Sequence, residues 1–281
     1  MSQTEQKLPI LGLTTLMFTI LSIVHTQLPA MAEEVAPEPN EEVAPEPNQE
    51  QEQLSAVDLY NRGVDKLEAG DYGGAVADFS DSLKLDPNDA DSHYNRGYAY
   101  QNLGNQRAAV YDYTEAIKIK PDYQQAYINR GAAYLAWSKY KEAIADFDEV
   151  IKLSPKNEAA LLSRGNAHHQ LEDYEAALGD YEEVISHNAK NVMAYYQRGL
   201  TYNQLQQNEE ALADYSEALQ IQPTFAEAFH NRGITRFKLE NIEEAITDLE
   251  KAAELYQQEG KTESYQSAMD AIKQIKEFSG S

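Results

Sequence analysis

The 281-residue sequence contains no cysteine, a single tryptophan and few basic residues. Without cysteine the chain has neither disulfides nor thiolate metal ligands, so its stability must come from packing. The 23 Lys and Arg residues face 47 Asp and Glu residues, which leaves a formal net charge of −24. This acidity argues against binding to nucleic acid and to anionic membrane surfaces, because both depend on a basic footprint.

Sequence motifs for catalysis are also absent. There is no glycine-rich phosphate loop, no H-E-x-x-H zinc motif and no cysteine-based metal pattern. The one pair of adjacent histidines is His168 and His169, and neighbouring residues on a helix point in different directions, which makes them poor joint metal ligands. We therefore expect a protein that is not an enzyme and that uses no metal, cofactor or small-molecule substrate.

A long uncharged run occurs only at the N-terminus. Residues 1–32 contain one lysine, Lys7, followed by an uncharged stretch from Leu8 that ends in Ala-Met-Ala at Ala32. This order predicts a secretory signal peptide cleaved after Ala32. The apolar core, residues 8–24, is shorter than the about 20 residues of a spanning helix, so cleavage is favoured and a membrane anchor is the alternative. We expect an exported protein in a periplasm or a thylakoid-type lumen.

Residues 33–53 form a second distinct segment. They include eight acidic residues, four prolines and no basic residue, and they contain the octapeptide Glu-Glu-Val-Ala-Pro-Glu-Pro-Asn twice. This composition predicts a disordered, extended linker, because it cannot bury enough apolar surface to fold. A spacer role is favoured over a motif for a proline-binding partner. The linker carries 8 of the net negative charges, and 16 remain on the sequence that follows.

From residue 56 onward the sequence is built from a 34-residue unit that occurs six times. Each unit contains Arg-Gly, an Ala twelve residues after the Gly, a large side chain four residues later and, in four units, a Pro eight residues after that. The Arg-Gly pairs are Arg62-Gly63, Arg96-Gly97, Arg130-Gly131, Arg164-Gly165, Arg198-Gly199 and Arg232-Gly233. A fixed period of this length predicts that small equal units stack on one another.

The repeated pattern resembles the tetratricopeptide repeat (TPR), a helix-turn-helix unit with G-x2-Y, A-x3-F and a closing Pro. The resemblance implies an all-α fold, a right-handed superhelical α-solenoid. Within residues 54–259 it places the repeats at 56–89, 90–123, 124–157, 158–191, 192–225 and 226–259. Residues 260–281 are expected to hold a capping helix, about 262–278, whose apolar stripe is Tyr265, Met269, Ile272 and Ile275.

Two features of the repeat need a physical reason. Glycine inside a helix costs about 1 kcal/mol relative to Ala, and we expect each one to let the Ala of the second helix pack closely. The Arg before each Gly is matched by an Asp sixteen residues later, and we expect structural ion pairs, with an Arg ladder for anionic ligands as the alternative. The expected pairs are Arg62 with Asp78, Arg96 with Asp112, Arg130 with Asp146, Arg164 with Asp180, Arg198 with Asp214 and Arg232 with Asp248.

The closing proline is missing from repeat 4 and from the last repeat, and only repeat 4 is followed by another repeat. Ala189 stands in its place in repeat 4, between the Pro155 of repeat 3 and the Pro223 of repeat 5. Proline ends a helix because it lacks an N–H group and clashes with the preceding turn. We expect the joint between repeats 4 and 5 to bend more easily than the other joints.

The TPR resemblance also implies a concave groove that binds peptides or protein segments, lined by positions 2, 5, 9 and 12 of each repeat. Our candidate groove residues are Tyr60, Tyr94, Tyr98, Gln101, Ile128, Leu162, Asn166, His169, Met193, Tyr196, Asn203, His230 and Phe237. This set is apolar and rich in Tyr, a residue enriched at interfaces. It lacks the cationic clamp with which TPR co-chaperones grip an acidic C-terminus. We expect Tyr94→Ala with Tyr196→Ala to abolish binding at a stability cost below about 2 kcal/mol.

The expected function is therefore a non-enzymatic scaffold that binds a peptide or helix of a partner protein. An assembly or maturation factor for an exported or membrane complex is favoured, and a stable regulatory or structural subunit that recruits a separate enzyme is the alternative. A monomer is the expected state for a capped array. A carbohydrate or small-ligand role is less favoured, because the single tryptophan, Trp137, stands at the end of a first helix where packing explains it.

Overall fold

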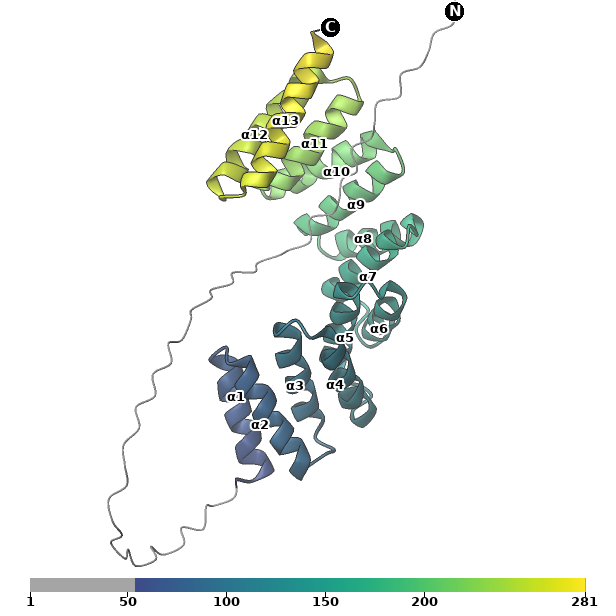
Figure 1. Cartoon of the computed structure of the whole chain (residues 1–281). Coiled ribbons are helices and arrows are strands. Elements are labelled where there is room, and N and C mark those ends of the chain that lie inside the picture. Colours follow the sequence, from purple (N-terminus) through teal and green to yellow (C-terminus); the bar gives the residue numbers. More distant parts are fainter. Residues whose placement is uncertain (1–53, 281) are drawn as a thin grey trace, which may run out of the picture. The chain divides into compact units, whose positions relative to one another are not determined.

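The computed structural model describes residues 54–280, which form thirteen α-helices and no strand (Figure 1). Six helix pairs are followed by one further helix. The pairs are α1 (Ala56–Glu68) and α2 (Tyr72–Leu85), α3 (Ala90–Asn102) and α4 (Gln106–Ile119), α5 (Gln124–Ala136) and α6 (Tyr140–Leu153), α7 (Glu158–Gln170) and α8 (Tyr174–His187), α9 (Val192–Gln204) and α10 (Asn208–Ile221), and α11 (Ala226–Lys238) and α12 (Ile242–Gln258). The last helix is α13 (Thr262–Ser279). Each first helix begins at the residue where the sequence places the start of a repeat.

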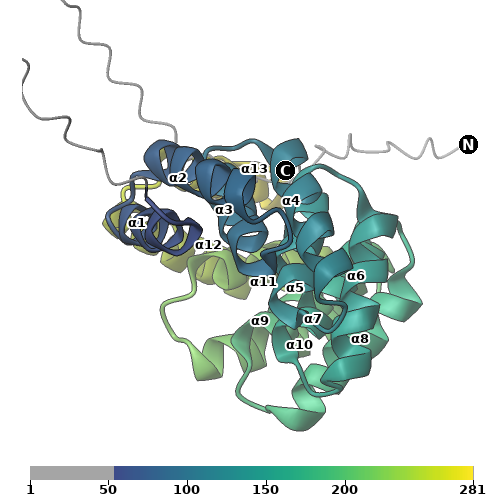
Figure 2. The same cartoon turned by 90° about the horizontal axis from the view of Figure 1, so that it is seen from below.

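The described helices stack in chain order. Each helix packs on the next, and the first helices of neighbouring repeats also touch one another. Figure 2 shows the first helices α5, α7 and α9 towards the inside of the turn made by these repeats, and the second helices α6 and α8 towards the outside. Contacts limited to neighbouring units define a solenoid. The predicted all-α solenoid of helix pairs is confirmed.

The turn inside each repeat depends on two adjacent residues. Gly70 has a φ of 76°, a left-handed conformation that costs glycine nothing, and Asp71 then caps α2 by accepting a 2.9 Å hydrogen bond from the N–H of Gly74. Gly104 and Asn105 repeat this arrangement before α4. The later repeats place other residues in the left-handed conformation, namely Ser138, Glu172, Gln206 and Glu240.

Five of the six second helices end at the same register, and one of these five, α8, has no proline after it. Helix α2 ends at Leu85, two residues before Pro87, and α8 ends at His187, two residues before Ala189. Proline is therefore not required for this end of the helix in repeat 4, whereas α12, which has Gln257 at the proline position, continues to Gln258. Beside Ala189 the carboxylate of Glu158 accepts hydrogen bonds from the side chains of Asn188 (3.0 Å) and Asn191 (2.8 Å).

The core of each repeat is the large side chain of the second helix, packed against the glycine of the first. A Cβ atom built on Gly63 would lie 2.7 Å from the ring of Phe79, and one on Gly131 would lie 2.8 Å from the ring of Phe147. The expectation that glycine makes room for the Ala of the second helix is wrong for these repeats, because the close neighbour is the aromatic ring sixteen residues on. The corresponding side chains in all six repeats are almost completely buried, namely Phe79, Tyr113, Phe147, Tyr181, Tyr215 and Leu249.

Helix α13 covers the last repeat. Its side chains Ala268, Ile272 and Ile275 are buried, and Ile272 and Ile275 share a cluster with Ala245 and Leu249 of α12. Met269, which the sequence placed in the apolar stripe, is 39% exposed, so the buried face has Ala268 in its place. The small Ala268 lets α13 approach closely, and it joins a second buried cluster around Tyr256.

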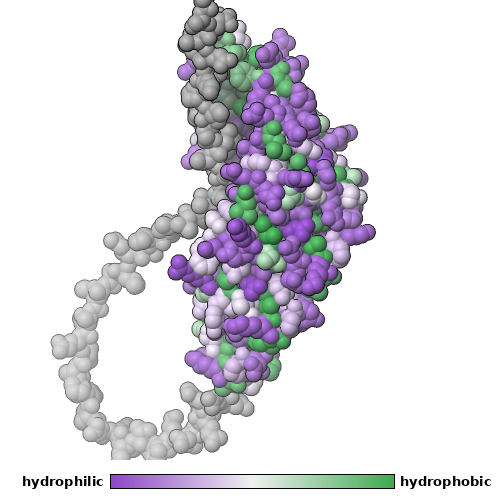
Figure 3. All heavy atoms as spheres, turned by 90° about the vertical axis from the view of Figure 1, so that its right-hand side faces the viewer, coloured by the Kyte–Doolittle hydropathy of each residue, from purple (hydrophilic) through white to green (hydrophobic). Residues whose placement is uncertain are grey.

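The surface of the repeats is mainly polar. Figure 3 shows hydrophilic residues over most of the face on the right-hand side of Figure 1, with hydrophobic residues in small separate groups. Among the described residues no helix is long and apolar enough to cross a membrane. The expected signal peptide with its cleavage at Ala32, and the expected linker at residues 33–53, lie outside the described residues.

Candidate functional site

Each Arg of the Arg-Gly motif contacts the Asp sixteen residues later, within its own repeat. In repeat 3 the Nε and Nη2 atoms of Arg130 donate hydrogen bonds of 2.9 and 2.6 Å to the two carboxylate oxygens of Asp146. The side chain of Asp146 is 4% exposed, and a carboxylate buried to this degree needs a charged partner. The same contact occurs in Arg62–Asp78, Arg96–Asp112, Arg164–Asp180, Arg198–Asp214 and Arg232–Asp248.

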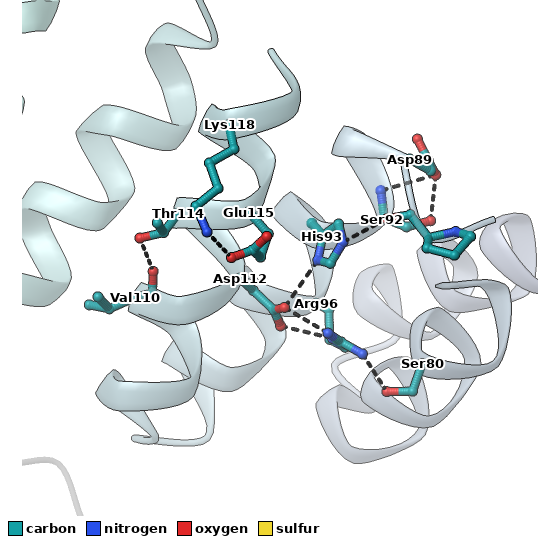
Figure 4. A network of polar contacts seen from close by, with 11 residues as sticks. Ser80, Asp89, Ser92, His93, Arg96, Val110, Asp112, Thr114, Glu115 and Lys118 are labelled. Carbon is teal, nitrogen blue, oxygen red and sulfur yellow. Dashed lines mark hydrogen bonds and ion pairs between the residues drawn. The ribbon is translucent and has the colours of Figure 1, made fainter. Parts of the chain in front are cut away.

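In four repeats the third guanidinium nitrogen reaches the preceding repeat, namely in Arg96, Arg130, Arg164 and Arg232. The Nη1 atom of Arg96 donates to the hydroxyl of Ser80 at 3.1 Å, and that of Arg130 donates to Thr114 at 2.9 Å. Figure 4 shows the arrangement around Arg96, where His93 also contacts Asp112 at 3.2 Å. Because both sides of the guanidinium are engaged, these Arg side chains join repeats and have few donors left for an anionic ligand.

The environment of the Asp changes along the array. In repeat 1, which has no repeat before it, the hydrogen bond from Arg62 lowers the pKa of Asp78. In repeats 3 and 5, burial raises the pKa of Asp146 and Asp214. The inner carboxylates therefore depend more heavily on their Arg partners to remain charged.

The tyrosines at position 5 are contacts between repeats. The hydroxyl of Tyr94 accepts a 2.9 Å hydrogen bond from the side chain of Asn129 in the next repeat, and its ring lies 5.8 Å from Tyr113 and 5.0 Å from Tyr123. Tyr196 has the equivalent hydrogen bond from Asn231 at 2.9 Å. Burial raises the pKa of both tyrosines. We therefore revise the expectation that both can be removed at little cost in stability, because each holds two repeats together.

The Asn partners of these tyrosines are not among the candidate residues predicted from the sequence. Tyr60 bonds Asn95 at 3.1 Å in the same way, so every Tyr at position 5 is followed 35 residues later by its Asn partner. Where position 5 is Ile128 or Leu162, the residue 35 positions on is Ser163 or Gln197. This internal correlation is the signal that reveals the contact.

Several polar candidates at positions 9 and 12 satisfy buried groups. The hydroxyl of Tyr113 donates to Gln101 at 2.7 Å, and that of Tyr181 donates to Asn166 at 2.8 Å. Asn203 donates to the hydroxyl of Tyr215 at 2.9 Å. Where the buried residue is Phe79 or Phe147, position 12 is Leu67 or Leu135, which needs no hydrogen bond. These polar residues therefore occur where a buried side chain needs a hydrogen-bond partner, which indicates packing and not ligand binding.

The two candidate histidines are also partly buried. His169 lies 2.8 Å from the hydroxyl of Thr201 in the next repeat, and the ring of His230 lies 6.4 Å from that of Tyr256. Burial lowers the pKa of both imidazoles. The residues that the structure describes contain no cluster of side chains suited to hold a metal ion.

The remaining candidates form what we call the first-helix surface, made of Tyr98, Ile128, Leu162, Met193 and Phe237. Tyr98 on α3 is 40% exposed and Met193 on α9 is 44% exposed, whereas the other three are partly buried. The two acidic residues at position 2 are both engaged: Asp91 accepts a hydrogen bond from Tyr123 at 2.8 Å, and Glu227 pairs with Lys261 at 2.8 Å. This surface is apolar and carries no unpaired carboxylate at these positions.

Sequence comparison finds repeat models along most of the described chain. Models of the TPR repeat match residues 65–104, 165–206 and 199–239, and models of the tetratricopeptide repeat match residues 90–123, 125–157 and 226–259. No curated protein matches the chain significantly.

Solved structures with the same fold are distant in sequence. MamA 41-end from Desulfovibrio magneticus RS-1 is 19% identical over 60% of this chain and 96% of its own, with a TM-score of 0.58. YrrB, described as a TPR protein with an unusual peptide-binding site, is 24% identical over 69% and 97%, with a TM-score of 0.55. PilW, described as a widely conserved type IV pilus biogenesis factor, is 19% identical over 76% and 98%, with a TM-score of 0.65. The spacing of the repeats, the helix pairs and these matches show that the chain belongs to the tetratricopeptide repeat family.

Proposed function

We propose that this chain is a non-enzymatic scaffold that binds a helix or an extended segment of a partner protein on its first-helix surface. The observation that carries the proposal is the exposure of Tyr98 and Met193 at positions 9 and 2 of their first helices. Exposed Tyr and Met side chains offer apolar area that a partner can bury. Tyr and Met also tolerate partners of different shape.

The chemistry of the surface indicates the class of ligand. Positions 2, 5, 9 and 12 of the six repeats contain no Lys or Arg, so a ligand held chiefly by its carboxylates is disfavoured. Burial of apolar area contributes about 25 cal/mol per Å², and an amphipathic helix or an extended apolar segment supplies such area. YrrB, which has the same fold, is described as having a peptide-binding site, and this supports the proposal by analogy.

We further place the protein outside the cytoplasm as an assembly or maturation factor, acting as a monomer. This part of the proposal rests on the sequence of residues 1–32 and on the likeness to PilW, described as a pilus biogenesis factor. Stoichiometric recovery with a mature complex would instead favour a stable subunit, whereas substoichiometric recovery favours an assembly factor.

The test is affinity capture from native membranes and soluble extract, followed by mass spectrometry. The bait is the full chain, and the binding variant is Tyr98→Ala with Met193→Ala. The matched control is Leu85→Ala with Leu153→Ala, which are 52% and 47% exposed at the ends of second helices. We expect a partner that is retained by the wild type and the control and lost from the binding variant. Equal recovery with all three baits would contradict binding at the first-helix surface.

A further inference from the structure

We propose a second interaction site, a cationic patch around the single tryptophan, that binds an acidic segment of a partner protein. The patch consists of Arg107, Trp137 and Lys139, and Lys141 follows in the first turn of α6. Trp137 follows α5 and is 36% exposed. The guanidinium carbon of Arg107, from α4 of the preceding repeat, lies 5.2 Å from the centre of its ring, and the Nζ of Lys139 lies 5.7 Å from it.

These three cations differ from most others in the array. The Arg of each Arg-Gly motif is bonded to its Asp, and Lys66, Lys118, Lys152 and Lys251 each contact a carboxylate. Within residues 54–280, Arg107, Lys139 and Lys141 contact no carboxylate within 4.0 Å, although Glu142 is the next residue after Lys141. Their charges are therefore free to pair with a ligand.

The local sequence concentrates positive charge at the cost of helix capping. Lys139 occupies the N-cap of α6 and makes no side-chain capping bond, like Gln207 and Asn241 before α10 and α12, whereas Asp71, Asn105 and Asp173 cap the other second helices. Loss of such a cap destabilises the start of a helix. A cation beside the N-terminus of a helix is also unfavourable, because that end already carries a partial positive charge. Packing alone gives no reason for this choice of residue.

The negative charge of the surface around the patch favours a short anionic segment over a larger anionic partner. The sequence after residue 53 carries a net charge of −16, so a membrane or a nucleic acid placed over the patch would also meet the acidic surface around it. A short acidic segment avoids this repulsion because it contacts only the patch. Its carboxylates would pair with Arg107, Lys139 and Lys141, and an apolar residue between them would pack on the exposed part of Trp137.

Trp137 reports on this site directly, because it is the only tryptophan in the chain. The full chain is titrated with a synthetic peptide that repeats Glu-Glu-Leu-Pro, while the emission of Trp137 and its quenching by acrylamide are recorded. We expect a saturable shift of the emission and weaker quenching. About 0.5 M NaCl should abolish both effects, because charges are screened within a few ångströms at that ionic strength.

Variants separate the patch from general electrostatics. Arg107→Gln with Lys139→Gln and Lys141→Gln should weaken binding of the peptide by about tenfold or more, since each exposed ion pair contributes up to about 1 kcal/mol. Lys156→Gln with Lys190→Gln, which removes exposed charges elsewhere, should leave binding unchanged. The proposal would be overturned if the emission of the wild type did not respond to the peptide, or if a peptide with Gln in place of Glu gave an equal response. It would also be overturned if binding of the peptide were weakened equally in both variants. Tighter patch-dependent binding to phosphatidylserine vesicles than to the peptide would overturn it as well.

A separate set of contacts points to a second inference: the joint between repeats 4 and 5 is the hinge of the array. In the described residues this joint keeps the 2.8 Å contact of His169 with Thr201 but lacks three features of the first two joints. Proline is replaced by Ala189, the Tyr–Asn bond is replaced by Leu162 and Gln197, and Arg198 bonds only Asp214 of its own repeat. The joint between repeats 3 and 4 lacks the Tyr–Asn bond but keeps Pro155 and the 2.7 Å contact of Arg164 with Asp148.

The hinge is tested by distance measurements, because the chain has no cysteine and introduced spin labels are unique. One labelled pair, Ala145→Cys with Ala213→Cys, spans the proposed hinge. The comparison pair, Ala77→Cys with Ala145→Cys, spans two joints that have all three features. All these Ala residues lie on the outer side of second helices and are at least partly exposed. We expect a broader distance distribution for the first pair. Adding Leu162→Tyr, Gln197→Asn and Ala189→Pro should narrow it. Equal widths for the two pairs would overturn the inference.

Discussion

Replacement of Arg130 by Ala isolates the interaction that recurs in every repeat. The variant removes two hydrogen bonds to Asp146, of 2.9 and 2.6 Å, and one to Thr114 in the preceding repeat. The side chain of Asp146 is 4% exposed, so water cannot replace the guanidinium. Removing one partner of a buried ion pair costs about 3–5 kcal/mol.

The assay is thermal unfolding followed by far-ultraviolet circular dichroism. For a domain of this size each kcal/mol shifts the Tm by about 2–4 °C, so we expect Arg130→Ala to melt about 6–20 °C lower than the wild type. Lys141→Ala is the control, because Lys141 is exposed and unpaired, and its effect should stay within about 0.5 kcal/mol. Equal losses in the two variants would refute the reasoning.

The pH dependence gives an independent check on the cause. Burial raises the pKa of Asp146, and loss of Arg130 raises it further above the unfolded value of about 3.9. A group with a raised folded pKa stabilises the fold fully below its unfolded pKa and loses that contribution as the pH rises. The stability difference between variant and wild type should therefore be largest at about pH 7 and shrink towards about pH 4. Addition of Asp146→Asn should recover part of the loss.

Three further predictions concern the packing of the repeats. Gly131→Ala should lower the free energy of unfolding by about 1–3 kcal/mol, because its Cβ would lie 2.8 Å from the ring of Phe147. Gly179→Ala, on the exposed face of α8, should instead raise the free energy of unfolding by up to about 1 kcal/mol. The opposite order of the two variants in urea titration would contradict this packing. Tyr94→Phe should lower the free energy of unfolding by about 1 kcal/mol, the value of its hydrogen bond. Tyr94→Ala should lower it by about 3–5 kcal/mol, because the ring packing is lost as well. Similar losses in the two variants, measured by urea titration, would show that the ring packing contributes little. Burial lowers the pKa of His169 in the folded protein. As the pH drops below about 6.5, His169 therefore takes up a proton in the unfolded chain before it does so in the folded protein, and the stability falls. His169→Leu with Thr201→Ala, which copies the Leu135 and Ala167 of the preceding joint, should reduce that fall in a pH series, and an unchanged slope would exclude His169 as its source.

The 34-residue period made the helix pairs predictable from sequence. Arg-Gly marks the first helix, Ala and the large side chain mark the second, and the six copies are in phase. The spacing of Arg and Asp likewise indicated their contact, because a charge that recurs with a partner at constant separation needs that partner. The same pattern did not show that Gly faces the aromatic ring, since Ala75 and Phe79 lie on the same face of α2 and only the structure distinguishes their distances from Gly63.

The candidate binding residues were harder to predict. Positions 5, 9 and 12 lie between the interior of the array and its first-helix surface, so residue type alone does not tell packing from binding. Tyr94, Tyr196 and Gln101 resemble ligand-binding residues by chemistry, yet each satisfies a neighbouring group within the array. Met269 shows the same limit in α13, where an apolar residue at helical spacing stays 39% exposed.

The most direct test of the central proposal is site-specific photo-cross-linking from the first-helix surface. A benzophenone amino acid is introduced at Tyr98 or Met193, and at Leu85 or Leu153 as controls, and the full chain is irradiated in its native compartment. Binding at the first-helix surface should give a discrete cross-linked partner protein from Tyr98 and Met193 and none from the two controls. Cross-links of equal yield from all four positions, or from the controls alone, would contradict it.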